Sequence, residues 1–137
     1  MTDKPRTEFT GSELSRLQAY EVVELLRRKE VSTSELLDVS LARIEAVSPS
    51  INATPTVCPD RARLAAKNLD TPDADHPGNL YGLPIGIKDL TPVKGVRTTF
   101  GTKGLADNIP DNSDPLVERL EERGGVVVGK TNTPEFG

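Results

Sequence analysis

An unbroken β-branched run, Val126-Val127-Val128, constrains the fold more than any other feature of the chain. Such a run is typical of a strand that is covered on both faces. A helix is expected before it, because Asp114 followed by Pro115 is a typical helix start and Gly124 is a typical stop. An earlier strand is expected near residues 83–88. A helix between two strands favours a right-handed crossover with parallel pairing, so the sequence predicts an α/β fold.

Helical signals dominate the first half of the chain. Ser15 and Ser32 each precede a glutamine or glutamate by three residues, which is the spacing of a capping box. We therefore expect helices near residues 15–29 and 33–47, the second of them ended by Pro49. That second helix has the clearest amphipathic pattern, with apolar residues on one face at Leu37, Leu41, Ile44 and Val47.

A third helix is expected to begin at Pro59. Small side chains form a shallow apolar stripe along it, at Ala62, Ala65, Ala66 and Leu69. Residues 70–79 have the composition of a loop and separate the helical half from a second half that is rich in glycine. In that second half, the helix after Asp114 is expected to be anchored by Leu116, Val117 and Leu120.

A chain of this length fits one compact domain. Its composition limits the kinds of partner that it can bind. The 137 residues carry 17 Lys and Arg against 21 Asp and Glu, a formal net charge of −4. This balance argues against direct nucleic-acid binding, because phosphates need a concentrated basic face. One cysteine and one histidine exclude a disulfide framework and the usual zinc clusters, and no cofactor or metal is expected. No apolar run could span a bilayer and no signal peptide is visible, so we expect a cytoplasmic protein.

Residues 124–131, Gly-Gly-Val-Val-Val-Gly-Lys-Thr, fit the pattern of a phosphate-binding P-loop. A P-loop needs a flexible turn after a strand, so that backbone N–H groups can curl around a phosphate. Valine is stiff and extended, so here the strand would lie inside the motif. A nucleotide-binding module is therefore a disfavoured alternative. Lys130 is expected to be a polar residue at the carboxyl end of a strand.

Two other reactive side chains have ordinary interpretations. His76, the only histidine, lies in the most loop-like segment and is expected to be solvated. Cys58, the only cysteine, precedes a predicted helix and is expected to be partly buried and inert.

Lys88 ends the earlier predicted strand, where alternation divides the side chains between two faces. One face carries Leu83, Ile85 and Ile87. The other face carries Gly82, Pro84, Gly86 and Lys88. The glycines leave space beside the lysine, and ligand sites in open α/β sheets lie at the carboxyl ends of strands. A lysine without water there can lose its proton and act as a general base for a serine. Composition alone favours the competing interpretation, a solvated lysine paired with a carboxylate such as Asp89.

Three blocks of sequence resemble the amidase signature family. They are residues 80–90 (LYGLPIGIKDL), 95–101 (GVRTTFG) and 124–136 (GGVVVGKTNTPEF). The segments Glu30-Val-Ser-Thr-Ser-Glu-Leu and Leu41-Ala-Arg-Ile-Glu are similar to the helical lead-in of the same family. The resemblance covers residues from about 13 to 137, and the order and spacing of the blocks make it specific.

The resemblance implies an enzyme that hydrolyses amide bonds; some members of the family transfer the released ammonia to a misacylated tRNA. The implied fold is a mixed sheet wrapped by helices, of which this chain has the N-terminal part: a helical lead-in followed by a β-loop-α-β unit. The implied triad is a serine, a second serine on a cis peptide bond, and a lysine. Lys88 falls on that catalytic lysine, and residues 129–132 fall on a structural strand end.

The family's Gly/Ser-rich segment, which carries both serines and the oxyanion-hole amides, has no counterpart in residues 1–137. We therefore divide the chain into a polar segment, 1–14, and the N-terminal part of an amidase signature domain, 15–137, truncated before that segment. Thr133-Pro134-Glu135 resembles a helix start and also suggests a fragment. Without its nucleophile the chain alone is expected to be inactive.

The sequence thus predicts the N-terminal part of an amidase that hydrolyses the C–N bond of a small-molecule carboxamide. The amidase subunit of a tRNA-dependent amidotransferase is placed second, because residues 88–92 (KDLTP) and 132–137 (NTPEFG) look more like stand-alone amidases. A third alternative is a non-catalytic protein that binds a partner through exposed helices. The valine run is expected to need another strand beside it, and a homodimer is a reasonable prior.

Overall fold

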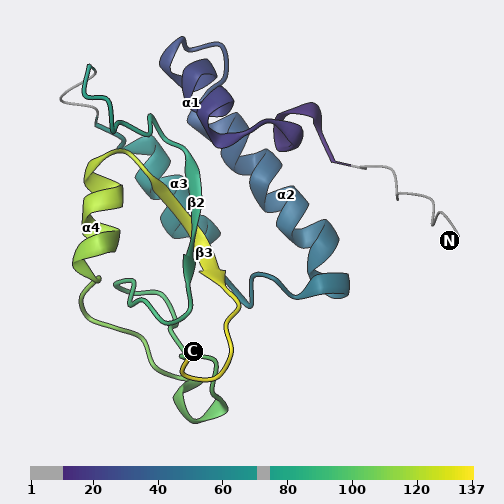
Figure 1. The fold of residues 1–137 in the computed structure, drawn as a ribbon, viewed down its shortest axis with the longest axis vertical. Coiled ribbons are helices and arrows are strands. Elements are labelled where there is room, and N and C mark those ends of the chain that lie inside the picture. Colours follow the sequence, from purple (N-terminus) through teal and green to yellow (C-terminus); the bar gives the residue numbers. More distant parts are fainter. Residues whose placement is uncertain (1–10, 71–74) are drawn as a thin grey trace, which may run out of the picture.

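The computed structural model describes residues 11–70 and 75–137. Most of the predicted polar segment 1–14 and part of the predicted loop 70–79 lie outside these residues. The described chain has an α/β fold, as predicted (Figure 1). Its elements, in order, are η1 (Glu13–Arg16), α1 (Ala19–Arg27), α2 (Thr33–Ile51), β1 (Thr56–Val57), α3 (Pro59–Lys67), β2 (Pro84–Lys88), η2 (Lys103–Leu105), α4 (Pro115–Glu122) and β3 (Val126–Thr131).

The strands form one mixed sheet in the order β1-β3-β2. β2 and β3 pair in parallel, which confirms the predicted crossover through α4. β1 pairs antiparallel with β3, opposite Gly129 and Lys130. The sequence did not predict this two-residue strand. β3 is the central strand, but β1 lies opposite Gly129 and Lys130 alone and is followed by one hydrogen bond from the Cys58 N–H to Val128 O. The expectation that the valine run needs another strand beside it therefore stays a prediction.

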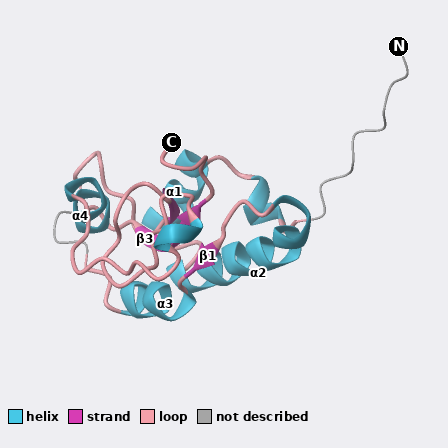
Figure 2. Ribbon diagram, turned by 90° about the horizontal axis from the view of Figure 1, so that it is seen from below, coloured by secondary structure: helices cyan, strands magenta, loops and turns pink. Residues whose placement is uncertain are grey.

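The valine run is buried between two layers of helix, as predicted. Val127 packs with Val117 of α4 and Ile87 of β2. Val126 and Val128 point the other way and pack against α2 and α3, through Leu37 and Ala62. Figure 2 shows α2 and α3 together along one side of the strands. β3 is therefore covered on both faces, and its last residues, after Val128, are held firmly in place.

The predicted helix 15–29 is wrong in its first four residues. Residues Glu13–Arg16 form a short 3-10 helix, and α1 begins only at Ala19. The capping box lies three residues later than expected, because the Gln18 backbone N–H donates to Glu21 Oε2 at 2.7 Å. Ser15, the expected cap, instead shares a hydrogen bond with Ser12 at 3.2 Å between the two hydroxyl oxygens.

The second predicted helix is confirmed, with its capping box between Ser32 and Glu35. Its predicted end is wrong, since Pro49 lies inside α2 and the helix continues to Ile51. Proline removes one N–H donor, and in a last turn this loss affects a single hydrogen bond. The helix ends where Asn52 adopts a left-handed conformation and donates its N–H to Ser48 O.

The predicted bounds of α4 are confirmed in atomic detail. Asp114 caps the helix by accepting a hydrogen bond from the Leu116 N–H at 2.8 Å. At the other end Gly124 has φ of +84°, and Gly125 donates its N–H to Leu120 O, which is a Schellman ending. The prediction that Leu116 anchors this helix in the core is wrong, because Leu116 is 59% exposed.

The other helical predictions have mixed outcomes. α3 begins at Pro59 as predicted, and its alanine stripe packs against α2 and β3, with Ala62 fully buried. The predicted helix start at Thr133-Pro134-Glu135 forms no helix among the described residues. Its backbone is engaged elsewhere, because Phe136 donates its N–H to Phe100 O at 2.8 Å. No helix in residues 11–70 and 75–137 has the length and apolar character needed to cross a membrane.

Candidate functional site

Lys88 is the last residue of β2 and lies in register with Thr131 of β3. Its side chain is exposed, whereas its neighbour Ile87 is buried in the core, so the predicted alternation holds at this end of the strand. Gly86 is also exposed. A Cβ on Gly86 would lie 2.7 Å from the Thr131 Cγ2 methyl, so that methyl partly occupies the space that the sequence left beside the lysine.

The alternation does not extend back to Leu83. The strand begins at Pro84, and Leu83 packs with Tyr81 against α1 and α2 rather than with Ile87. Gly82 lies in a turn with φ of +94°. The apolar face of β2 is therefore shorter than predicted.

The carboxylate predicted as a partner of Lys88 is engaged elsewhere. Within the described ranges the Lys88 side chain has no hydrogen bond or ion pair. Asp89 instead forms an ion pair with Lys130, with 3.3 Å between Oδ1 and Nζ. The two side chains are 2% and 0% exposed, so this pair is fully enclosed. The Lys88 side chain is exposed, and its predicted pairing with Asp89 is wrong.

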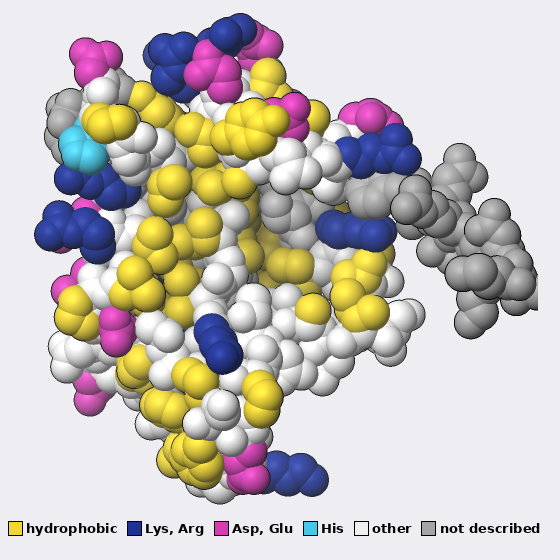
Figure 3. Space-filling model, viewed as in Figure 1, with side chains coloured by type: hydrophobic (Ala, Val, Ile, Leu, Met, Phe, Trp, Pro, Cys, Tyr) yellow, Lys and Arg dark blue, Asp and Glu magenta, His cyan; other side chains and the backbone are white. Residues whose placement is uncertain are grey.

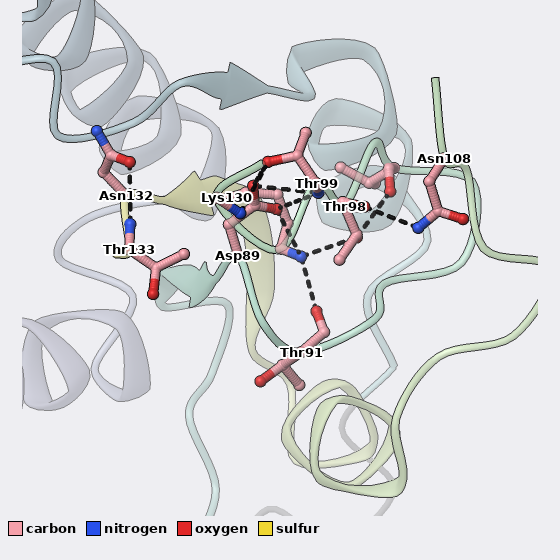
Figure 4. Close-up of polar contacts among 10 residues, drawn as sticks. Asp89, Thr91, Thr98, Thr99, Asn108, Lys130, Asn132 and Thr133 are labelled. Carbon is pink, nitrogen blue, oxygen red and sulfur yellow. Dashed lines mark hydrogen bonds and ion pairs between the residues drawn. The ribbon is translucent and has the colours of Figure 1, made fainter. Parts of the chain in front are cut away.

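Lys130 fills all of its hydrogen-bonding capacity inside the protein (Figure 4). An ammonium group has three donors. Lys130 Nζ donates to the Thr91 carbonyl oxygen at 2.7 Å and to the Thr98 hydroxyl at 2.9 Å, and its third neighbour is the Asp89 carboxylate. Burial lowers the pKa of Lys130, and the negative charge of Asp89 opposes that shift. The carboxylate thus helps to hold a charge where desolvation disfavours it.

Asp89 and Thr98 also have hydrogen-bond partners inside the protein. The Asp89 carboxylate accepts hydrogen bonds from both the backbone N–H and the hydroxyl of Thr99. The Thr98 hydroxyl donates to Val96 O at 3.1 Å, and Asn108 Nδ2 donates to Thr98 O at 2.7 Å. We call Asp89, Thr98, Thr99 and Lys130 the buried polar cluster; it joins the ends of β2 and β3 to the loop after β2.

The sequence did not predict this cluster. Lys130 was expected at the end of a strand, yet it is one of the largest fully buried side chains of the described chain. A signal was nevertheless present, because Lys130 is a charged residue two positions after a run covered on both faces, and a buried charge needs an opposite charge. Asp89, next to the end of the parallel strand, was the available carboxylate.

The P-loop alternative is wrong. Residues Val126–Thr131 form a buried strand instead of a flexible loop. The Lys130 ammonium is occupied by Thr91, Thr98 and Asp89, and it lies away from solvent. It is therefore not available to a phosphate.

His76 and Cys58 lie as their ordinary interpretations suggest. His76 Nδ1 accepts a hydrogen bond from the Gly78 N–H at 2.9 Å and so belongs to a turn. The Cys58 thiol is half-buried and donates to Val127 O at 3.5 Å. Burial raises the pKa of Cys58, which makes the reactive thiolate scarcer. No group of three or more His, Cys, Asp or Glu residues in the described ranges could hold a metal ion.

The alternative of a binding protein rests on exposed apolar side chains. Figure 3 shows hydrophobic side chains over the middle of one face, with most charged side chains toward its rim. Tyr20 of α1 is 74% exposed, and Leu64 of α3 is 61% exposed. Single exposed apolar residues are ordinary on protein surfaces and do not identify a partner.

Comparison with known proteins identifies the family. A family model described as Amidase matches residues 35–137. The chain is 43% identical over 128 residues to the A subunit of the glutamyl-tRNA(Gln) amidotransferase of Anaeromyxobacter dehalogenans, covering 92% of this chain and 26% of that protein. The chain belongs to the amidase signature family. It is also 38% identical over 131 residues to the acylamidase of Rhodococcus erythropolis, covering 94% of this chain and 28% of the relative.

A solved structure agrees with this family assignment. The 6-aminohexanoate cyclic dimer hydrolase complexed with substrate matches with a TM-score of 0.79 and 31% identity, covering 92% of this chain and 25% of that chain. The amidase signature chain thus spans about a quarter of the length of its curated relatives, 26% and 28% in the two cases above. The described fold corresponds to this part of the larger amidase architecture.

Proposed function

We propose that this chain is the N-terminal part of an amidase and that Lys88 is its catalytic general base. Family membership supports the activity, since hydrolysis of C–N bonds is characteristic of amidase signature enzymes. One observation carries the assignment of the residue. Lys88 ends β2 with its side chain exposed on the face away from the Ile87 core, beside Gly86, which has no side chain.

In the proposed reaction, neutral Lys88 accepts a proton from the nucleophilic serine through the serine on the cis peptide bond. The nucleophile attacks the carbonyl carbon of a carboxamide, and the C–N bond breaks as the nitrogen takes up the proton from Lys88. Water then hydrolyses the acyl-enzyme: Lys88 removes a proton from the water, and that proton is returned to the serine oxygen as the acyl–serine bond breaks. Both serines and the oxyanion-hole donors would come from a Gly/Ser-rich segment outside residues 1–137.

The proposed substrate is a small-molecule carboxamide, with no cofactor or metal and no direct contact with nucleic acid. The amidase subunit of a tRNA-dependent amidotransferase is a second candidate, and the 43% identity to a protein of that kind supports it. Robust hydrolysis of simple amides without tRNA or partner subunits favours the first candidate, and hydrolysis that depends on them favours the second. The homodimer and the cytoplasmic location remain predictions.

Replacement of Lys88 by alanine in the full-length protein that carries this chain tests the proposal. General bases contribute roughly 10²- to 10⁴-fold to rate, so we expect amide hydrolysis to fall by about that factor. Lys103→Ala, which removes another exposed lysine, is the matched control and should keep full activity. The 137-residue chain alone should hydrolyse no amide. Near-normal activity in the Lys88→Ala protein would overturn the assignment.

A further inference from the structure

We infer that Lys130 and Asp89 are positioning residues, which hold the backbone on the carboxyl side of Lys88 and thereby place its amine for catalysis. The inference rests on the proposed function of Lys88. Neither side chain needs to contact substrate, because both are enclosed in the protein interior. Their action on the reaction would pass entirely through the geometry of β2 and the turn after it.

Lys130 holds the far end of that turn. The Thr91 N–H donates to the Lys88 carbonyl oxygen at 2.9 Å, which closes residues 88–91 into a turn. The Thr91 carbonyl oxygen in turn accepts the 2.7 Å hydrogen bond from Lys130 Nζ. Lys130 therefore fixes the residue that is itself hydrogen-bonded to the Lys88 backbone.

Asp89 holds the near end. Its backbone N–H donates to Thr131 O at 3.0 Å, so the pairing with β3 continues one residue beyond Lys88. Its side chain is 2% exposed and lies against Lys130 and Thr99. On the other side of Lys88, Ile87 is 6% exposed and packed in the core. Lys88 thus lies between two buried residues, Ile87 and Asp89, that are held by these contacts, and its own side chain points to solvent.

The register of the sheet explains why the two residues can cooperate. Ile87 is in register with Lys130 and Lys88 with Thr131. In-register residues of parallel strands lie on the same face, so Lys130 shares the buried face with Ile87 and Asp89. The buried polar cluster therefore holds β2 on the face opposite the one from which Lys88 projects. It does not occupy the space around the Lys88 amine.

A purely structural role would lower stability without a specific effect on the chemical step. A positioning role predicts a loss in kcat with little change in KM, because a misplacement of about 1 Å costs roughly 100-fold in rate. We therefore expect Lys130→Met in the full-length protein to lower kcat by about 100-fold and to change KM by less than about twofold. Assays are run well below the melting temperature of every variant.

The matched control is Val22→Ala, which leaves a gap in the separate apolar cluster between α1 and α2, away from Ile87 and the turn after Lys88. It should lower the melting temperature and keep kcat within about twofold of the wild-type value. A folded Lys130→Met protein with the same kcat as Val22→Ala would overturn the inference. A Lys130→Met protein in which only KM changes, with kcat at the wild-type value, would also overturn it.

A milder pair of variants covers the case in which Lys130→Met does not fold. Thr98→Val has nearly the same shape and removes the hydroxyl that accepts from Lys130, whereas Thr98→Ser keeps it. We expect Thr98→Val to lower kcat about tenfold, because one of the three interactions of the Lys130 ammonium is lost. Thr98→Ser should keep kcat near the wild-type value. An unchanged kcat in folded Thr98→Val, or equal losses in the two variants, would overturn the inference.

Lys88→Ala, measured in parallel, separates this inference from the proposed function. If Lys88→Ala is inactive while Lys130→Met retains kcat, the positioning inference fails and the proposed function stands. If Lys88→Ala keeps its activity, the proposed function fails and the inference falls with it. Loss of kcat in both variants, with kcat of Val22→Ala unaffected, supports both.

Discussion

Replacing Lys130 by methionine would remove a fully buried cation and leave the Asp89 side chain, itself 2% exposed, without its counter-charge. The 2.7 Å and 2.9 Å hydrogen bonds to Thr91 O and the Thr98 hydroxyl would be lost at the same time. Removing one partner of a buried ion pair typically costs about 3–5 kcal/mol, because the other charge stays buried and unpaired. We expect Lys130→Met to destabilise the protein by that amount, and Asp89→Asn likewise.

The double variant Asp89→Asn/Lys130→Met distinguishes this cause from a simple packing defect. It removes both charges, and the asparagine oxygen still accepts from the Thr99 backbone. We therefore expect the double variant to cost only about 1–2 kcal/mol, the value of a few lost hydrogen bonds. The two single changes would then be strongly non-additive, with a coupling of about 3 kcal/mol or more.

Urea unfolding, followed by circular dichroism and fluorescence of a site-specific label, gives the free energies for this cycle. Coincident transitions in the two probes show that the free energies are comparable between variants. The reasoning is refuted if Lys130→Met costs less than about 1 kcal/mol. It is also refuted if the double variant costs as much as the two single variants added together.

Two further predictions concern other parts of the fold. Because burial raises the pKa of Cys58, little thiolate forms at pH 8, and iodoacetamide should alkylate the thiol slowly, at a rate that is still rising when the pH is above the ordinary thiol pKa. An alkylation rate equal to that of the urea-unfolded chain would contradict this. Gly82→Ala places a Cβ 2.0 Å from Thr33 Oγ1 at a φ of +94°, and should cost about 1–3 kcal/mol in urea unfolding. Gly104→Ala, where the nearest atom is 3.8 Å away, is its control, and equal costs in the two variants would show that the reasoning is wrong.

Local signals in the sequence predicted much of the fold. Asp114, Gly124 and the Ser32 capping box each act within one helical turn, and the structure confirms all three. The valine run predicted a strand buried on both faces because burial depends directly on hydrophobicity. Pro49 misled the prediction, since its cost depends on its place in the helix and is small in a last turn.

The candidate site was predictable only in part. Alternation along the strand placed Lys88 on the face away from Ile87, and the structure agrees. The partners of Lys130 could not be predicted by local rules, because its nearest acceptor, Thr91 O, is 39 residues away in sequence. Such contacts depend on how β2 registers with β3, and that register contains an irregularity between Ile85 and Gly86 that no periodic pattern reveals.

The central claim is that Lys88 drives acylation of the serine nucleophile. Its most direct test is a single-turnover experiment in which the full-length protein is mixed with a chromogenic anilide and the acyl-enzyme is followed by intact mass. We expect the wild-type protein and Lys103→Ala to acquire the acyl group within the first turnover. Lys88→Ala should remain unmodified on the same timescale. Acylation of Lys88→Ala at the wild-type rate would contradict the claim.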